Sequence, residues 1–235
     1  MNTALISGGT GGLGLAVTRS FLQSGWRCVV PYSKPASAQR LTEFFSDTQT
    51  LERLHLIQAD LFEQAAVTDL VSQADVPTAP LAALVNLLGG FDAPGPVHEV
   101  PLERFGKQLE LNLRATYLLC AAALPGMLDR ADGAIICVSS RAALRPFPGA
   151  AGYVTSKAAV LAFVDALASE YTAAGVRINA ILPSIIDTPS NRAAQPASDY
   201  SNWVKPEEIA PLISFLCSPG ARAISGAHIP IYGRA

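Results

Sequence analysis

The chain has 235 residues and a net charge of −2, with half of its residues hydrophobic and 15% charged. It contains no basic block of the kind that binds nucleic acid, so nucleic acid is not an expected partner. The charged fraction lies below the ~25% of a typical globular protein. We therefore expect a homodimer or homotetramer in which part of the surface is hidden.

Length and apolar content favour one large α/β domain over residues 1–235. No apolar run reaches the ~18 residues that a membrane span needs, and the first residues lack the pattern of a signal peptide. The four cysteines are far apart within apolar segments, which favours buried free thiols in a reducing compartment. We therefore expect a cytoplasmic protein with no membrane contact. The three histidines do not cluster, so no metal site is expected.

Short apolar runs alternate with longer helical patterns along the whole chain. Strands are predicted over residues 2–7, 26–32, 54–59, 81–87, 133–139, 176–182 and 228–232. Helices are predicted over residues 12–24, 37–46, 64–74, 101–129, 153–174 and 206–217. Several of the strands are apolar throughout, as expected where helices cover both faces of a parallel sheet. The pattern predicts a Rossmann-like, doubly wound α/β fold with about seven parallel strands.

A glycine-rich turn follows the first predicted strand and reads Ser7-Gly8-Gly9-Thr10-Gly11-Gly12-Leu13-Gly14. Glycine lets the backbone approach a pyrophosphate closely, and the first N–H groups of the next helix can bind its negative charge. The motif lies between a strand and a helix within a βαβ unit, which is the context that it requires. The dinucleotide contacts predicted here are Ser7, Gly8, Thr10, Gly12, Leu13 and Gly14.

The end of the second predicted strand bears on which dinucleotide is bound. An acidic residue there would accept a hydrogen bond from a ribose 2′-hydroxyl, whereas basic or hydroxyl groups suit a 2′-phosphate. This chain has Ser33 and Lys34 at that point and no acid nearby. NADP(H) is therefore the favoured cofactor. NAD(H) stays possible, because Lys34 could instead be a solvated loop charge.

Two irregular segments, residues 89–96 and 183–205, follow the fourth and sixth predicted strands. Open α/β sheets bind their ligands at the carboxyl ends of strands, and long loops in compact domains are usually functional or disordered. Residues 183–205 are therefore a candidate substrate lid. The alternative is a connector without a role.

Tyr153 and Lys157 open an alanine-rich helical pattern. Residues four apart share a helix face, so the phenol and the ammonium can point into one site. A nearby cation favours the phenolate and lowers the pKa of a tyrosine. This spacing predicts that Tyr153 acts as a general acid whose pKa is lowered by Lys157.

The glycine turn, Asn112, Ser140, Tyr153 and Lys157 occur in an order and spacing that resemble the short-chain dehydrogenase/reductase family over essentially the whole chain. The resemblance implies a catalytic tetrad of Asn112, Ser140, Tyr153 and Lys157. Asn112 would hold a proton-relay water, and Ser140 would bind the carbonyl oxygen. Ser139 is expected to point away from Ser140, because side chains alternate along a strand.

The same resemblance implies further cofactor contacts along the chain. Asp60 and Leu61 match the adenine end, Asn86 and Gly89 match the segment after the fourth strand, and Lys157 and Tyr153 match the nicotinamide ribose. Pro183, Ile186 and Thr188 match the nicotinamide end. Two departures from the family pattern stand out, namely the more apolar Asn86-Leu87-Leu88-Gly89 and Ser184 after Pro183.

The implied function is NAD(P)(H)-dependent interconversion of a small-molecule carbonyl and an alcohol, with Tyr153 as the general acid and base. The segment from Asp187 to Arg192 and the later Trp203 are similar to a segment of dihydropteridine reductase, so pterin reduction is one alternative. A non-catalytic NAD(P)-binding redox sensor or scaffold is another, although it would not need the tetrad. The identity of the substrate stays open.

Overall fold

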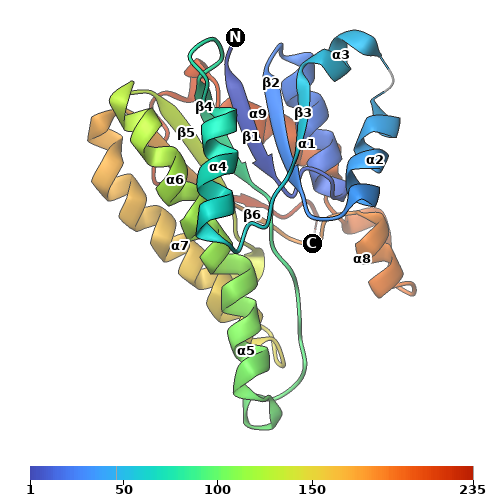
Figure 1. Ribbon diagram of the computed structural model, residues 1–235. Helices are drawn as coiled ribbons and strands as arrows, with labels where there is room; N and C mark the ends of the chain where they lie inside the picture. The colour runs from blue at the N-terminus through green and yellow to red at the C-terminus, as the bar shows by residue number, and fades with distance from the viewer. Residues whose placement is uncertain (46, 235) are drawn as a thin grey trace.

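A computed structural model describes residues 1–45 and 47–234 of the protein (Figure 1). Seven strands form a single sheet. They are β1 (Thr3–Ser7), β2 (Arg27–Tyr32), β3 (Leu54–Gln58), β4 (Leu81–Asn86), β5 (Gly133–Val138), β6 (Val176–Pro183) and β7 (His228–Ile231). Their order is β3-β2-β1-β4-β5-β6-β7, and all neighbouring strands are parallel. The predicted doubly wound parallel sheet is confirmed.

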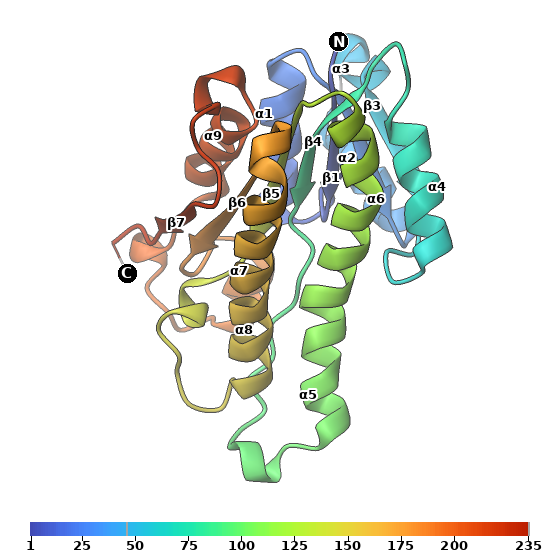
Figure 2. The same ribbon diagram turned by 90° about the vertical axis from the view of Figure 1, so that its left-hand side faces the viewer.

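The helices connect successive strands and cover both faces of the sheet (Figures 1 and 2). They are α1 (Gly12–Gln23), α2 (Pro35–Phe44), α3 (Thr48–Glu52), α4 (Gln64–Ala74), α5 (Leu102–Leu109), α6 (Ala115–Asp129), α7 (Ala151–Tyr171), α8 (Pro189–Ala194) and α9 (Pro206–Leu216). A π-helical turn, η2 (Glu110–Arg114), joins α5 to α6. Short 3-10 turns supply several of the remaining connections.

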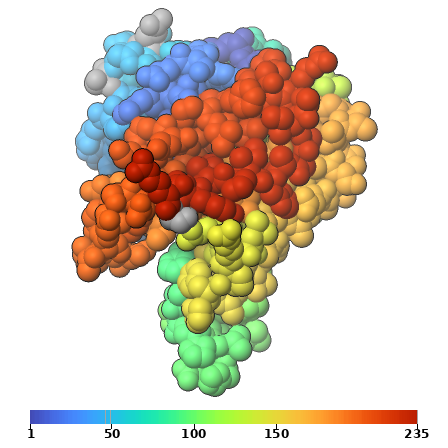
Figure 3. All heavy atoms as spheres, turned by 180° about the vertical axis from the view of Figure 1, so that it is seen from behind, coloured from blue at the N-terminus to red at the C-terminus, as the bar shows by residue number. Residues whose placement is uncertain are grey.

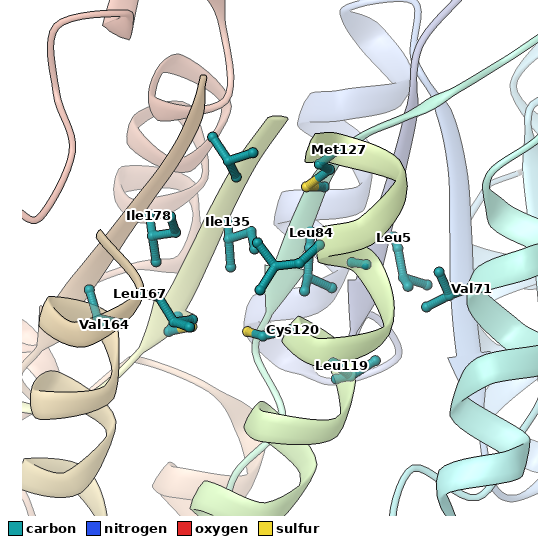
Figure 4. Close-up of a cluster of buried hydrophobic side chains, with 14 of the residues drawn as sticks. Leu5, Val71, Leu84, Leu119, Cys120, Met127, Ile135, Val164, Leu167 and Ile178 are labelled. Carbon is teal, nitrogen blue, oxygen red and sulfur yellow. The ribbon is translucent and has the colours of Figure 1, made fainter. Parts of the chain in front are cut away.

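Two hydrophobic cores lie on opposite faces of the sheet, because side chains alternate along each strand. Leu5 of β1 points into the core beneath α4, α6 and α7, whereas Ala4 and Ile6 point into the core beneath α1 and α9. Figure 4 shows part of the first core, in which Leu84, Cys120 and other side chains meet between the sheet and the helices. All four cysteines are buried and free, as the sequence predicts.

The helix boundaries differ from the sequence predictions in a few places. The helix predicted over residues 101–129 is divided by the π-helical turn η2, and two short helices, α3 and α8, were not predicted. Such short helices carry too few turns for a periodic apolar pattern to show. The last residue of the helix predicted over 37–46 lies outside the described residues.

Two helical stretches, Leu102–Asp129 and Ala151–Ala174, are long and apolar enough by composition to cross a membrane. α6 and α7 pack one face on the sheet and supply much of the first core, whereas α5 packs against α7. The core helix of a soluble protein can meet the same criteria, so composition alone does not indicate a membrane span here.

Candidate active site

The carboxyl ends of β1, β4, β5 and β6 lie side by side, because these strands are adjacent and parallel. The predicted site residues follow these ends. Figure 3 shows the surface hollowed between two projections there, one formed by the segments around α5 and after β5 and the other by the segment around α8. A ligand at this edge would meet side chains from four different loops.

The glycine turn is packed so closely that side chains would not fit at several positions. Gly8 has a φ of +70°, a left-handed conformation that favours glycine. A Cβ on Gly14 would lie 2.2 Å from the Gly8 carbonyl oxygen, and one on Gly12 would lie 2.7 Å from Cγ2 of Thr188. Leu13 is buried in the second core. The compact turn ends at the N-terminus of α1, so its geometry fits a pyrophosphate-binding site.

The side chains of Ser7 and Asn86 are used within the protein. The Ser7 hydroxyl donates to Oδ1 of Asn86 over 2.5 Å, and both residues are buried. Nδ2 of Asn86 donates to Oγ1 of Thr116 at 2.7 Å. Ser7 and Asn86 can therefore contact a cofactor only through their main chains, because their side chains join β1 to β4 and α6.

Asn112 lies in the π-helical turn and is almost completely buried. Its Oδ1 accepts from the Gly90 amide at 3.0 Å. Its Nδ2 donates to the Gly90 carbonyl at 3.1 Å and to Oγ of Ser156 at 3.0 Å. The side chain therefore fixes the loop after β4 against the helix that carries Tyr153, while the main-chain carbonyl of Asn112 accepts from the Thr116 hydroxyl.

A continuous chain of buried hydrogen bonds joins the glycine turn to α7. It runs from Ser7 through Asn86, Thr116 and Asn112 to Ser156, whose hydroxyl donates to the Tyr153 carbonyl at 2.8 Å. Along this chain the hydroxyls of Thr116 and Ser156 each accept one hydrogen bond and donate the next. Sequence reasoning did not identify Thr116 and Ser156, because nothing in their local pattern reveals these distant partners.

The Ser140 side chain lies close enough to Tyr153 to influence the pKa of its phenol. Oγ of Ser140 also accepts from the Ala142 amide at 3.1 Å, which leaves its own proton for donation. Ser139 points elsewhere, as expected, because its hydroxyl donates to the Lys157 carbonyl at 2.7 Å. The serine and tyrosine of the predicted tetrad thus lie together.

Lys157 is only 5% exposed, and its Nζ donates to the Val138 carbonyl at 2.9 Å. Nζ lies 6.0 Å from the centroid of the Tyr153 ring. A Cβ on Gly89 would lie 2.9 Å from Nζ and 2.7 Å from Oδ1 of Asn112, so this glycine permits the close approach. All four predicted tetrad residues therefore meet around the end of β5 and the start of α7.

The predicted lowering of the Tyr153 pKa is wrong. Burial raises the pKa of Tyr153, and the neighbouring Ser140 side chain acts in the opposite direction without reversing the shift. Burial also lowers the pKa of Lys157 to about 8, because the protein interior disfavours the ammonium form. The sequence spacing predicts that the Tyr153 phenol and the Lys157 ammonium lie close together. It does not reveal how strongly the surrounding protein desolvates them.

Ser33 and Lys34 are exposed between β2 and α2. Lys34 is the N-cap residue of α2, so a group bound at this point would face two cationic features, the ammonium and the positive end of the helix. Ser33 accepts a hydrogen bond at its carbonyl from Gln58 at 3.4 Å, which leaves its hydroxyl available.

Asp60 and Leu61 follow β3 and flank the same end of the sheet. The Asp60 carboxylate accepts from the Phe62 amide at 2.9 Å, and Leu61 is buried in the first core. Thr10 is partly exposed within the glycine turn. Asp60 and Thr10 could therefore contact a dinucleotide, while the Leu61 side chain is occupied in packing.

Residues 183–205 pack back on the glycine turn. Thr188 caps α8 by accepting from the Asn191 amide at 3.2 Å, and its methyl group lies against Gly12. Ile186 pairs with Val204 in a short bridge, and Pro183 ends β6 in a buried position. Trp203 is only 7% exposed and anchors this segment beneath Tyr200, with ring centroids 4.7 Å apart.

Comparisons with known proteins identify short-chain dehydrogenases as relatives of this chain. A family model for short chain dehydrogenases matches residues 2–199. Dehydrogenase/reductase SDR family member 4 of Bos taurus is 33% identical over 98% of this chain and 85% of its own length. A 2-(R)-hydroxypropyl-CoM dehydrogenase of Xanthobacter autotrophicus is 29% identical over 98% of this chain and 96% of its own.

The structural comparison agrees. ElxO with NADP bound is 26% identical, with a TM-score of 0.91, and the match covers 99% of this chain and 97% of ElxO. One relative that is 32% identical over 75% of this chain and 83% of its own length is an inactive 2-(S)-hydroxypropyl-CoM dehydrogenase. The local similarity to dihydropteridine reductase is not shown by these comparisons. The fold, the family model and the relatives agree, and the chain belongs to the short-chain dehydrogenase/reductase family of NAD(P)-dependent oxidoreductases.

Proposed function

We propose that this protein interconverts a carbonyl and an alcohol, with NADP(H) as its favoured cofactor. The observation that carries the proposal is the meeting of Ser140, Tyr153 and Lys157 at the end of β5, where Lys157 is held by the Val138 carbonyl with its Nζ 6.0 Å from the centroid of the Tyr153 ring. Each of the three has the chemistry that the reaction needs. One relative at similar identity is inactive, so membership of the family does not by itself imply activity. The proposal therefore rests on the arrangement of these three side chains.

In the reductive direction, Tyr153 donates a proton to the substrate oxygen, and in the oxidative direction it takes that proton back. A tyrosine phenol is protonated at neutral pH, so Tyr153 is available as a proton donor. Ser140 donates a hydrogen bond to the same oxygen while negative charge develops there. The nicotinamide dinucleotide supplies or accepts the hydride when bound.

Lys157 and Asn112 organise the site around that pair. The Lys157 ammonium, held by the Val138 carbonyl, places a positive charge near Tyr153 and would help to stabilise its phenolate. Asn112 holds Gly90 and Ser156 in fixed positions on either side. The proton donor is thereby kept in one orientation toward the edge of the sheet.

The preference for NADP(H) rests on the end of β2. Ser33 and Lys34 are exposed there next to the N-terminus of α2. A 2′-phosphate carries more negative charge than a 2′-hydroxyl, so this environment favours the phosphorylated dinucleotide. ElxO, which is similar over nearly the whole chain, was solved with NADP bound.

The decisive experiment replaces the phenol alone. We expect Tyr153→Phe to bind NADPH as the wild type does but to lose at least ~100-fold in turnover of a ketone panel, since it removes the proton donor. Tyr171→Phe removes a hydroxyl from the far end of the same helix, so it should keep full turnover. Loss of NADPH absorbance measures turnover, and the same assay with NADH tests the cofactor preference.

Two results would contradict the proposal. Equal turnover by Tyr153→Phe and the wild type would remove Tyr153 from the mechanism. Tight NADPH binding by a wild type that turns over no ketone or alcohol would favour the redox-sensor alternative.

A further inference from the structure

Two phenylalanines lie exposed beside the proposed proton donor. Phe91 follows β4 and is 62% exposed, and Phe147 follows β5 and is 44% exposed. Their ring centroids are 6.2 Å apart, so the two side chains form one aromatic pair although they are distant in sequence. Large exposed aromatic side chains that gather in one place usually mark a binding surface.

The pair is in direct contact with Tyr153. The ring of Phe91 meets the ring of Tyr153 edge to face, with centroids 5.0 Å apart and an interplanar angle of 85°. This geometry is favourable for aromatic rings. A substrate that presents its oxygen to the Tyr153 hydroxyl therefore has Phe91 as an immediate neighbour.

The two loops that carry the pair are fastened together and to the body of the protein. The Gly95 amide donates to the Gly149 carbonyl at 3.2 Å, which joins the loop after β4 to the loop after β5. Asp92, next to Phe91, binds Arg104 of α5 through two hydrogen bonds of 2.7 and 2.9 Å. These contacts hold the aromatic rings in place without covering them.

The position of the pair distinguishes it from the other exposed phenylalanines. Phe44 stacks under the guanidinium of Arg19 at 4.3 Å, and Phe215 lies on α9, which packs against α1. Of the exposed phenylalanines among the described residues, only Phe91 and Phe147 lie in ring contact with Tyr153 or with a ring that contacts it.

We propose that Phe91 and Phe147 form an apolar subsite that binds an aromatic or similarly flat apolar substituent next to the substrate carbonyl. The inference rests on the proposed function and narrows its substrate class to aryl and bulky apolar ketones or aldehydes. Binding such a group covers the exposed faces of both rings and removes apolar surface from water. A small aliphatic ketone reaches the same proton donor without gaining these contacts.

The test compares acetophenone with butanone, each assayed by the loss of NADPH absorbance. We expect the wild type to have a kcat/KM for acetophenone at least ~10-fold above that for butanone, given the extra apolar contact. Phe91→Ala and Phe147→Ala should each reduce the acetophenone value several-fold more than the butanone value, so that the ratio of the two falls. Phe91→Leu keeps an apolar side chain against Tyr153 and should lose less. Phe215→Ala, a matched change on α9, should alter neither value.

The possible failures are distinct. An equal loss for both ketones in Phe91→Ala and Phe147→Ala means that the pair only supports Tyr153, and it overturns the subsite while leaving the proposed function intact. If the alanine variants leave the ratio of the acetophenone and butanone kcat/KM values unchanged but dissociate an oligomer, a second copy of the chain covers the phenylalanine pair. That result also overturns the subsite. A wild type without turnover of either ketone, or of any other carbonyl, removes the proposed function and this inference with it.

Discussion

At the scale of single residues, the ammonium of Lys157 has the most unusual environment in the site. It is buried beside Tyr153 with the Val138 carbonyl as its hydrogen-bond acceptor, and burial lowers its pKa to about 8. A protonated Lys157 therefore destabilises the folded state relative to a solvated lysine. A cost of this kind is common where a charge is needed for function.

The lowered pKa predicts how a Lys157→Met variant responds to pH. Below pH 8 the folded wild type carries the buried charge, and the shift from 10.5 to about 8 corresponds to about 3 kcal/mol. Methionine avoids this penalty but leaves the Val138 carbonyl without its donor, which costs about 1 kcal/mol. We expect Lys157→Met to be about 2 kcal/mol more stable than the wild type at pH 7, with greatly reduced turnover.

The stability difference between Lys157→Met and the wild type should depend on pH. As pH rises from about 8 to 10.5, the wild type loses its buried charge, so its penalty fades and the advantage of the variant should disappear. Urea unfolding at pH 7 and pH 10 measures both differences. A variant that is less stable than the wild type at pH 7 would show that the ammonium is satisfied by its surroundings.

At the scale of elements, the π-helical turn between α5 and α6 places Asn112 in contact with two separate parts of the site. Thr116 donates to the carbonyl of Asn112, four residues earlier, and accepts from Asn86 of β4. Such bonds from threonine to a helical carbonyl compete with regular helix geometry, and π-helical turns often accompany functional sites. The result is that Asn112 faces both the loop after β4 and α7.

The buried hydrogen-bond chain predicts that Thr116 is a positioning residue. Thr116→Val keeps the shape of the side chain but removes the hydroxyl, which leaves Nδ2 of Asn86 and the Asn112 carbonyl without their partner. We expect unfolding to become easier by about 1–3 kcal/mol and kcat to fall about tenfold, because the orientation of Asn112 relaxes.

Thr116→Ser restores the hydroxyl and serves as the matched control. It should recover both kcat and most of the stability. If Thr116→Val loses stability with an unchanged kcat, the hydroxyl supports the fold alone and does not position the site.

At the scale of the whole molecule, a shallow groove between the η2–α6 helix and α7 is lined by apolar residues. Leu113 and Tyr117 of the η2–α6 helix and Phe163 of α7 line this groove, and the rings of Tyr117 and Phe163 lie 6.0 Å apart. Tyr117 is 56% exposed. Together with the low charged fraction, this groove supports the proposal that a second copy of the chain packs along α6 and α7.

A charged substitution in this groove tests the proposed assembly. We expect the wild type to be a dimer or tetramer at micromolar concentration and Tyr117→Asp to shift toward the monomer, because a buried carboxylate would be desolvated. Phe44→Asp places the same charge on an exposed phenylalanine of α2 and should leave the assembly unchanged. Light scattering measures the mass, and a monomeric wild type would contradict the proposal.

The sequence by itself determined the sheet and indicated the candidate residues of the site. Apolar strand runs alternating with helical patterns require a covered parallel sheet, and the glycine turn, Ser140, Tyr153 and Lys157 all occur at strand ends or helix starts that the pattern locates. The strands and the Tyr153–Lys157 pair follow from local spacing, since the repeat of a helix or a strand fixes which side chains share a face, whereas Ser140 was indicated by the family resemblance. Strand ends were accordingly predicted to within two residues.

Only the tertiary structure decided how those residues behave. The raised pKa of Tyr153 and the lowered pKa of Lys157 come from desolvation, which depends on every atom packed around them. The hydrogen bond between Asn86 and Thr116 and the contact of Phe91 with Tyr153 join residues that are far apart in the chain. A local pattern holds no record of such partners, because they meet only when the strands have assembled and the loops at their carboxyl ends have packed together.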